Sequence, residues 1–220
     1  MLLALGAAGI ARAQNAPTPQ EVRIYAGLHE AAAKGDVAEI ERLIAEGERP
    51  NIQDSKSRTP LHVAAYVKHH AAARALLKLG ANPNALEIDK YDIITIASVA
   101  NDIEMLKVAI EGGASARNIT SRYDGTALIA AAHLGHAEVV RILIAAKAPL
   151  NHVNNLGWTA LMESIVLGNG GTNHTNTLKA LVEAGADVNI PDRQGITPLS
   201  HARRRGYSEM ARVLEMAGAR

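Results

Sequence analysis

Apolar and polar positions along the chain follow a pattern that repeats about every 33 residues. One position is apolar through most of the chain, and its members are Ile44, Leu77, Ile110, Ile144 and Val182. In the last copy the same position holds Glu215. A face that is apolar in the inner copies and charged in the last copy predicts that the copies stack on one another. The charged face of the last copy indicates that no further copy packs on that side.

A short phrase recurs with the same period. Its clearest copy is Thr59-Pro60-Leu61-His62-Val63-Ala64-Ala65, later copies begin at Thr126, Thr159 and Thr197, and weaker copies lie at 27–32 and 92–97. Thr126 and Thr159 are 33 residues apart, whereas Thr159 and Thr197 are 38 apart, so the fifth copy contains an insertion of five residues. Six copies in register indicate a repeat architecture.

Local signals predict two helices in each copy. Thr59 can cap a helix whose first residue is Pro60, and Asp36 followed by Glu39 predicts the start of a second helix. Glycines fall where each second helix must end, at Gly47, Gly80, Gly113, Gly185 and Gly218. The fourth copy has Lys147 there, and we therefore expect its helix end to be less well formed.

The phrase and its period resemble the ankyrin repeat, whose signature is Thr-Pro-Leu-His-x-Ala. The resemblance implies an all-α fold, an ankyrin-repeat solenoid of stacked helix-turn-helix units with projecting β-turn loops. It places the repeat domain at 22–220. The expected repeats are 22–53, 54–86, 87–120, 121–153, 154–191 and 192–220.

The first residues differ from the rest in composition. An apolar run from Leu2 to Ile10 precedes Ala11-Arg12-Ala13, which matches the Ala-x-Ala cleavage pattern. We expect a signal peptide at 1–13, cleavage after Ala13, a spacer at 14–21, and a periplasmic or secreted protein. The run carries no basic residue before it, and an accidental Ala/Leu-rich tail on a cytoplasmic protein is the alternative.

Composition excludes several kinds of site. The chain has 23 Lys and Arg against 22 Asp and Glu, which disfavours nucleic-acid binding through phosphate neutralisation. Cysteine is absent, so disulfides and thiolate metal sites are impossible. The nine histidines are scattered over different repeats, and His29 and His62 occupy the signature position, where the family uses the ring to tie neighbouring turns. We expect no metal, no cofactor and no membrane span.

The resemblance also implies where a partner would bind, at the tips of the projecting turns and the outer ends of the first helices. Four of the six aromatic residues fall on these positions. The expected contact residues are Tyr66, Val67, Tyr91, Val99, Tyr123, His133, Leu134, Leu156, Trp158, Val166 and Leu167. Their alternative role is to fold back and cover the helix ends. The Gly-rich insertion, 167–175, is expected to form a loop beside them.

These expectations favour a non-catalytic protein–protein interaction module, because no nucleophile–base pair or nucleotide-binding motif occurs. It would be a monomer in the periplasm that grips a protein on a concave groove, as an immunity protein or a stress-protective protein. The alternatives are a self-assembling structural protein, or a cytoplasmic adaptor or translocated effector if there is no signal peptide.

Overall fold

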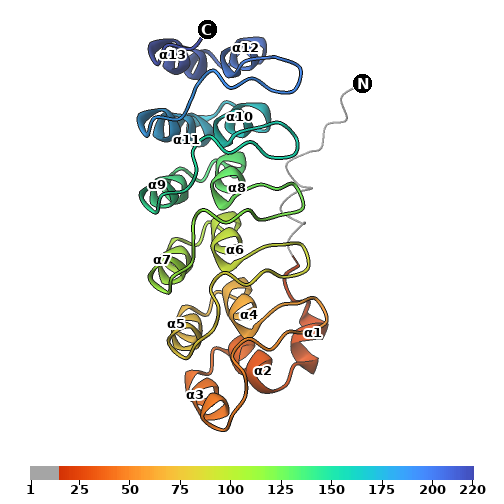
Figure 1. The fold of residues 1–220 in the computed structure, drawn as a ribbon. Coiled ribbons are helices and arrows are strands. Elements are labelled where there is room, and N and C mark those ends of the chain that lie inside the picture. Colours follow the sequence, from red (N-terminus) through yellow and green to blue (C-terminus); the bar gives the residue numbers. More distant parts are fainter. Residues whose placement is uncertain (1–14) are drawn as a thin grey trace. The chain divides into compact units, whose positions relative to one another are not determined.

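The computed structural model describes residues 15–220, which divide into an N-terminal unit ending at Ser115 and a C-terminal unit, Ala116–Arg220. The expected signal peptide, 1–13, and its cleavage site lie outside the described residues. Each unit is built from helix pairs joined by loops (Figure 1). Across the described residues there is no strand, and one isolated bridge joins Thr120 to Gly125. The all-α expectation is therefore confirmed.

The N-terminal unit contains a short leading helix and three helix pairs. The leading helix is α1 (Pro19–Ile24), and the pairs are α2 (Gly27–Lys34) with α3 (Val37–Ala45), α4 (Pro60–Tyr66) with α5 (His70–Lys78), and α6 (Ile93–Val99) with α7 (Ile103–Glu111). First helices pack on first helices, α2 on α4 and α4 on α6, and second helices pack likewise, α3 on α5 and α5 on α7. The expected spacer thus includes the start of α1.

The C-terminal unit repeats this arrangement. Its pairs are α8 (Ala127–Leu134) with α9 (Ala137–Ala145), α10 (Ala160–Val166) with α11 (Thr172–Glu183), and α12 (Pro198–Arg204) with α13 (Ser208–Met216). Helices α8, α10 and α12 form one layer, and α9, α11 and α13 form the other. Glu215, at the position that is apolar in inner repeats, is exposed and accepts a hydrogen bond of 2.7 Å from Arg203.

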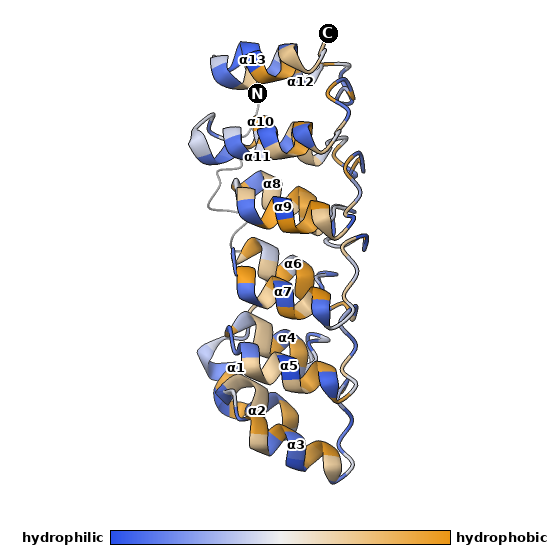
Figure 2. Ribbon diagram, turned by 90° about the vertical axis from the view of Figure 1, so that its left-hand side faces the viewer, coloured by the Kyte–Doolittle hydropathy of each residue, from blue (hydrophilic) through white to orange (hydrophobic). Residues whose placement is uncertain are grey.

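Short aliphatic side chains fill both units. Ala64, Ala97, Ala131 and Ala202, which each lie five residues after the Thr or Asp that begins the phrase, are all buried. Figure 2 shows that the helices carry most of the hydrophobic residues and the loops carry many of the hydrophilic ones. Small side chains at the contact allow neighbouring helices to approach closely, which explains a core with few large rings.

The helix caps form as the sequence predicts. The Thr59 side chain accepts from the backbone N–H of His62, and Asp36 accepts from that of Glu39. The glycines that end the second helices all have left-handed backbone, with φ between 83° and 103°. Lys147 also adopts this conformation, at φ 65°, and its helix closes with the same two hydrogen bonds as the helix before Gly185. The expectation of a less well formed end is wrong, because Lys147 accepts the left-handed conformation.

The insertion in the fifth repeat is only partly a loop. Residues 167–171 connect the two helices, but Thr172–Thr175 form the first turn of α11, which is 12 residues long, whereas the second helices of the other repeats have 9. Expecting a loop throughout 167–175 was therefore wrong over its last four residues. Gly171 has extended backbone and starts the helix, and the hydrogen bond from Thr175 N to Gly171 O closes the added turn at 2.9 Å.

Candidate protein-binding surfaces

Each projecting turn is organised by one polar side chain at its start. In the N-terminal unit the Asp54 carboxylate accepts from the backbone N–H groups of Lys56 (2.8 Å) and Arg58 (2.9 Å). Asn154 in the C-terminal unit accepts from Leu156 and Trp158 at 3.0 Å each. Side chains that bind backbone two and four residues on fix the turn without a strand partner. Glu87 and Asp192 do the same in their own turns.

The role of this position was not predicted from the sequence, although a regular spacing in the sequence indicates it. An Asp, Glu or Asn stands five residues before the Thr or Asp that caps each following helix, at Asp54, Glu87, Asn154 and Asp192. In the remaining turn the bridge between Thr120 and Gly125 closes the loop, and the Ser121 hydroxyl accepts from the backbone of Tyr123 at 3.3 Å. The turns are therefore fixed scaffolds that determine which way their side chains point.

In the C-terminal unit three consecutive turns are hydrogen-bonded to one another. The backbone N–H of Asn155 donates to the carbonyl of Tyr123 at 2.9 Å, and its side-chain amide donates to the carbonyl of Arg122 at 3.1 Å. The Arg193 guanidinium donates to the carbonyl of Asn155. These bonds hold Tyr123, Leu156, Trp158 and Arg193 on adjacent turns. We call these four residues the tip surface.

Two residues of the tip surface expose large apolar side chains. Tyr123 is 41% exposed and Leu156 is 39% exposed, while Trp158 is half-buried. The expected helix-end contacts of the same unit, Leu134, Val166 and Leu167, are also half-buried, as are Tyr66, Val67 and Val99 in the N-terminal unit. A half-buried side chain packs on the protein and still offers one face to a partner. A contact role for these residues stays a prediction.

The structure corrects the expected exposure of Tyr91. This residue is only 6% exposed, and Arg58, at the equivalent position, is 1% exposed. The backbone carbonyl at this position is held by the histidine of the preceding repeat, since His29 Nε2 donates to Arg58 O at 2.8 Å and His62 Nε2 donates to Tyr91 O at 3.2 Å. Anchored in this way, the residue lies against the neighbouring repeat, and Tyr91 is not available as a partner contact.

The structure also corrects the expected exposure of His133. This side chain is 6% exposed, and its Nδ1 donates to the Glu163 carboxylate at 3.1 Å. The other oxygen of that carboxylate accepts from the Asn154 side chain at 2.8 Å. A buried carboxylate requires such partners because burying it alone is costly. His133 therefore connects α8 to α10 and to the projecting turn, and it does not form part of an exposed groove.

The signature histidines tie neighbouring turns, as the family resemblance implies. His62 Nδ1 accepts from the backbone N–H of Thr59 at 3.1 Å, and Nε2 donates to the carbonyls of Ala85 and Tyr91. Burial lowers the pKa of His62 to about 4. The ring is therefore neutral at physiological pH, as its use of one nitrogen as donor and the other as acceptor requires.

A second histidine position reaches back to the preceding repeat. His69 Nε2 donates to the carbonyl of Ala33 at 3.1 Å, and His174 Nε2 donates to that of His133 at 2.9 Å. His174 lies in the insertion, and the added turn of α11 places its ring where it makes this contact with the preceding repeat. In the sixth repeat the Tyr207 hydroxyl donates to the carbonyl of Gly168 at 3.0 Å. These rings serve packing between repeats.

Within residues 15–220, no group of three or more His, Asp or Glu side chains is arranged to hold a metal ion. No helix of that part of the chain has the length and apolar character needed to cross a bilayer.

Comparison with known proteins agrees with this geometry. A family model described as ankyrin repeats (3 copies) matches residues 28–115 and 93–192, and a second, ankyrin repeats (many copies), matches residues 171–215. The chain belongs to the ankyrin-repeat family. Each unit is thus a segment of ankyrin-repeat solenoid, and ankyrin repeats are in general non-catalytic modules that bind proteins.

Bacterial ankyrin-repeat proteins are among the relatives. The ankyrin repeat protein YahD of Escherichia coli K12 is 32% identical over 190 residues, which cover 86% of this chain and 94% of YahD. A solved ankyrin repeat domain from Acinetobacter baumannii is 42% identical, with a TM-score of 0.84 over 88% of this chain and 98% of that one. The solved ankyrin repeat protein EF0377 is 29% identical, with a TM-score of 0.81 over 86% and 96%.

Larger proteins contain similar repeats as one part. The chain is 28% identical to the nuclear factor NF-kappa-B p105 subunit of Gallus gallus over 175 residues, which cover 77% of this chain and 17% of p105. The resemblance to such proteins concerns their repeat region.

Proposed function

We propose that this ankyrin-repeat chain binds a protein partner through the tip surface of its C-terminal unit. The observation that carries the proposal is the exposure of Tyr123 and Leu156 on turns that the backbone of Asn155 holds together. Isolated exposed apolar residues are common on proteins. Here they stand on two turns that are hydrogen-bonded to each other, and Trp158 is on the same turn as Leu156.

The chemistry of this surface suits a protein interface. Tyrosine and tryptophan are frequent energetic anchors of such interfaces because they bury a large area with few rotatable bonds. Ile119 and Val153, which directly precede two of the turns, are exposed as well. Arg193 adds a positive charge at one side of the surface. A partner that places apolar side chains there, with a carboxylate near Arg193, would complement it.

We further propose that the chain acts in the periplasm as a monomer. The support is the cleavage pattern ending at Ala13 together with the bacterial relatives. Blocking a toxin, as an immunity protein does, and protecting a partner from stress are both compatible with a binding module of this kind. Mass spectrometry of the protein recovered from a periplasmic fraction tests the location, and a mature chain that starts at Gln14 is the expected result.

A double substitution tests the binding surface. Tyr123→Ser with Leu156→Ser removes two exposed side chains and leaves the turn hydrogen bonds in place, because those use backbone atoms and Asn154. We expect the variant to lose partners that the wild-type chain captures. Stability should change by no more than about 0.5 kcal/mol, as for other surface substitutions.

The matched control is Met216→Ser, which removes an exposed apolar side chain from α13 of the same unit. It should leave capture unchanged. Equal loss in both variants, or unaltered capture by the double variant, would contradict the assignment of the tip surface. The mass of the wild-type chain in solution, measured by sedimentation, distinguishes a monomer from a self-assembling protein.

A further inference from the structure

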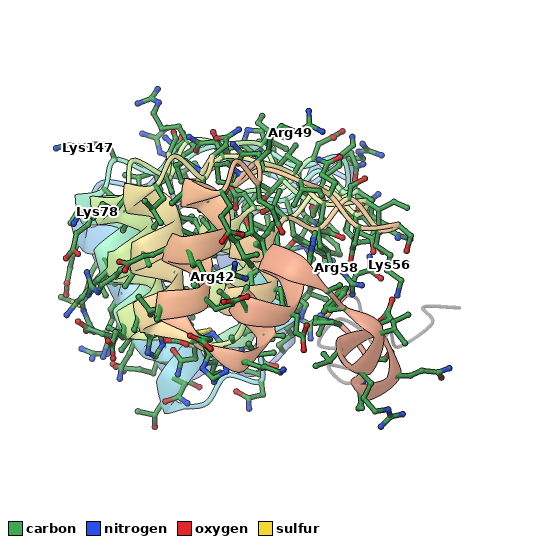
Figure 3. All side chains as sticks on the ribbon, turned by 90° about the horizontal axis from the view of Figure 1, so that it is seen from below. Arg42, Arg49, Lys56, Arg58, Lys78 and Lys147 are labelled. Carbon is green, nitrogen blue, oxygen red and sulfur yellow. The ribbon has the colours of Figure 1, made fainter. Side chains whose placement is uncertain are left out.

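Residues 15–25 lie across the projecting turns of the N-terminal unit, and we call them the N-terminal strap. Figure 1 shows α1 beside α2 in this unit, and Figure 3 shows Lys56 and Arg58 on the side of the unit where α1 lies. The Glu21 carboxylate accepts from Arg58 at 3.0 Å and pairs with Lys56 at 3.2 Å. The Tyr25 hydroxyl donates to Asp54 at 2.8 Å.

The first residue of the strap is held by both neighbouring turns. Its backbone carbonyl, Asn15 O, accepts from Arg58 at 2.9 Å, and its side-chain amide donates to Glu87 at 3.2 Å and also to Asp89. Because Asp54 belongs to one turn and Glu87 to the next, the strap bridges two repeats.

The strap supplies two of the partners of the buried Arg58 guanidinium. The guanidinium binds Asp54 at 2.7 Å from within its own turn, and its two other partners, Asn15 O and Glu21, come from the strap. The Tyr25 ring also lies against it, 5.9 Å from ring centre to guanidinium carbon. Arginine is seldom fully buried unless all its donors are paired. Without the strap, the Arg58 guanidinium would keep the Asp54 carboxylate as a partner and could bind a second carboxylate in place of Glu21.

The strap is held mainly by polar contacts, and the Tyr25 ring adds a contact with His29 at 5.2 Å between ring centres. No residue of α1 is buried, and Ile24 is exposed. By contrast, six of the seven residues of α4 are buried. Segments with few buried apolar contacts open locally far more often than the core of a domain. The strap can therefore leave the surface without unfolding the repeats beneath it.

We propose that the N-terminal strap is a detachable self-ligand that closes a carboxylate-binding site formed by Arg58 and Lys56. In the closed state Glu21 supplies the carboxylate. In the open state an acidic side chain of a protein partner takes its place on Arg58. The N-terminal unit would thus expose a second interaction surface only when the strap is displaced.

Hydrogen exchange on the full-length protein tests the detachment. The backbone N–H groups of Val22 and Tyr25 report on α1, since they donate to Thr18 O and Glu21 O, and that of Val67 reports on α4. We expect the two strap amides to exchange much faster than Val67 under native conditions. Exchange of all three at one common rate would overturn the proposal, because the strap would then open only with the whole unit.

Modification of arginine by phenylglyoxal tests the site beneath the strap. Arg58 should react slowly in the wild-type protein, with exposed Arg49 as an internal reference. In Glu21→Gln, which keeps a side-chain acceptor but loses the charge, the reaction at Arg58 should accelerate about ten-fold, as expected for loss of one hydrogen bond to a charged group. The control is Glu30→Gln, whose carboxylate pairs with Lys34 on α2 away from Arg58.

A peptide probe tests the ligand chemistry. A free peptide with the sequence of residues 15–25, added at millimolar concentration to the Glu21→Gln variant, should slow the modification of Arg58 again. The same peptide with Gln in place of Glu21 should protect less. Equal protection by the two peptides, or protection by neither, would overturn the carboxylate site, and an unchanged Arg58 in Glu21→Gln would overturn the strap as its cover.

Discussion

Replacing Lys147 with glycine should stabilise the C-terminal unit. Lys147 has a φ of 65° directly after α9, whereas glycine occupies the corresponding position after the other second helices. The backbone there is fixed by hydrogen bonds from Lys147 N to Ile144 O at 2.9 Å and from Ala148 N to Leu143 O at 3.0 Å. The Lys147 side chain is exposed.

The size of the effect follows from two opposing terms. A residue with a Cβ in the left-handed region costs about 1–2 kcal/mol, and glycine removes that cost. Glycine also makes the unfolded chain more flexible, which costs roughly 0.5–1 kcal/mol. The net expectation is a stabilisation of about 0.5–1 kcal/mol in the free energy of unfolding.

Urea denaturation followed by circular dichroism measures this difference. The midpoint should rise while the slope stays unchanged, because the substitution alters no buried area. Lys147→Ala is the matched control, since it removes the charge and keeps the Cβ, and it should not raise the midpoint. The reciprocal change, Gly113→Ala, should destabilise the N-terminal unit, because Gly113 has a φ of 89°.

Equal stability of the wild type and Lys147→Gly would refute the reasoning, because it would mean that the left-handed conformation carries no cost at this site. Stabilisation by Lys147→Ala of the same size would assign the effect to charge. Repeat arrays can unfold in more than one step, so exchange of the Lys147 and Ala148 amides should be measured in parallel.

Further predictions concern buried groups. Asn154→Ala should destabilise the C-terminal unit by about 2 kcal/mol, because two turn N–H groups and a buried carboxylate lose their partner. The fluorescence emission of Trp158, the single tryptophan, should report the loosened turn. An unchanged denaturation midpoint and an unchanged emission spectrum would contradict the role of the Asn154 side chain. His62 has a pKa lowered to about 4, so the unfolded state takes up a proton first as the pH falls below ~6.5, and stability should decline between ~6.5 and 4 by roughly 2 kcal/mol at pH 5. A ring titration by NMR with a midpoint near 6.5 would refute this. Gly168→Ala should destabilise the fifth repeat strongly, because a Cβ there would lie 2.0 Å from the Ser164 carbonyl oxygen, while melting equal to wild type would show that the backbone can shift.

The strap and the core should respond to acid in different pH ranges. The pKa of Glu21 is lowered to about 2, mainly by the backbone N–H of Thr18 and further by Arg58. The ionised carboxylate stabilises α1 through Thr18 and its docking through Arg58 at pH values above the unfolded pKa, and both contributions are lost as the pH falls from ~4.5 towards 2. Loss of protection in α1 above pH 5 would contradict this order.

The positions of the helices could be predicted from the sequence because their signals are local. A cap such as Thr59 acts on a backbone N–H three residues away, and glycines such as Gly80 permit a left-handed turn wherever they occur. The helical part of the insertion was harder to predict from the sequence, since Thr172–Thr175 have weak helix propensity. In the structure they are helical, and His174 in this turn donates to the carbonyl of His133 on another repeat.

Exposure at the candidate surface was decided by tertiary structure. Tyr91 and Trp158 occupy one repeat position, yet one is buried and the other half-buried, since the neighbouring residues differ in each copy. His133 is buried and paired with Glu163, thirty residues away. The sequence by itself determined the repeat, its helices and the turns between them. Which side chains reach solvent, and that residues 15–25 cover Arg58, depended on contacts between distant residues, because burial and ion pairing are properties of the folded neighbourhood.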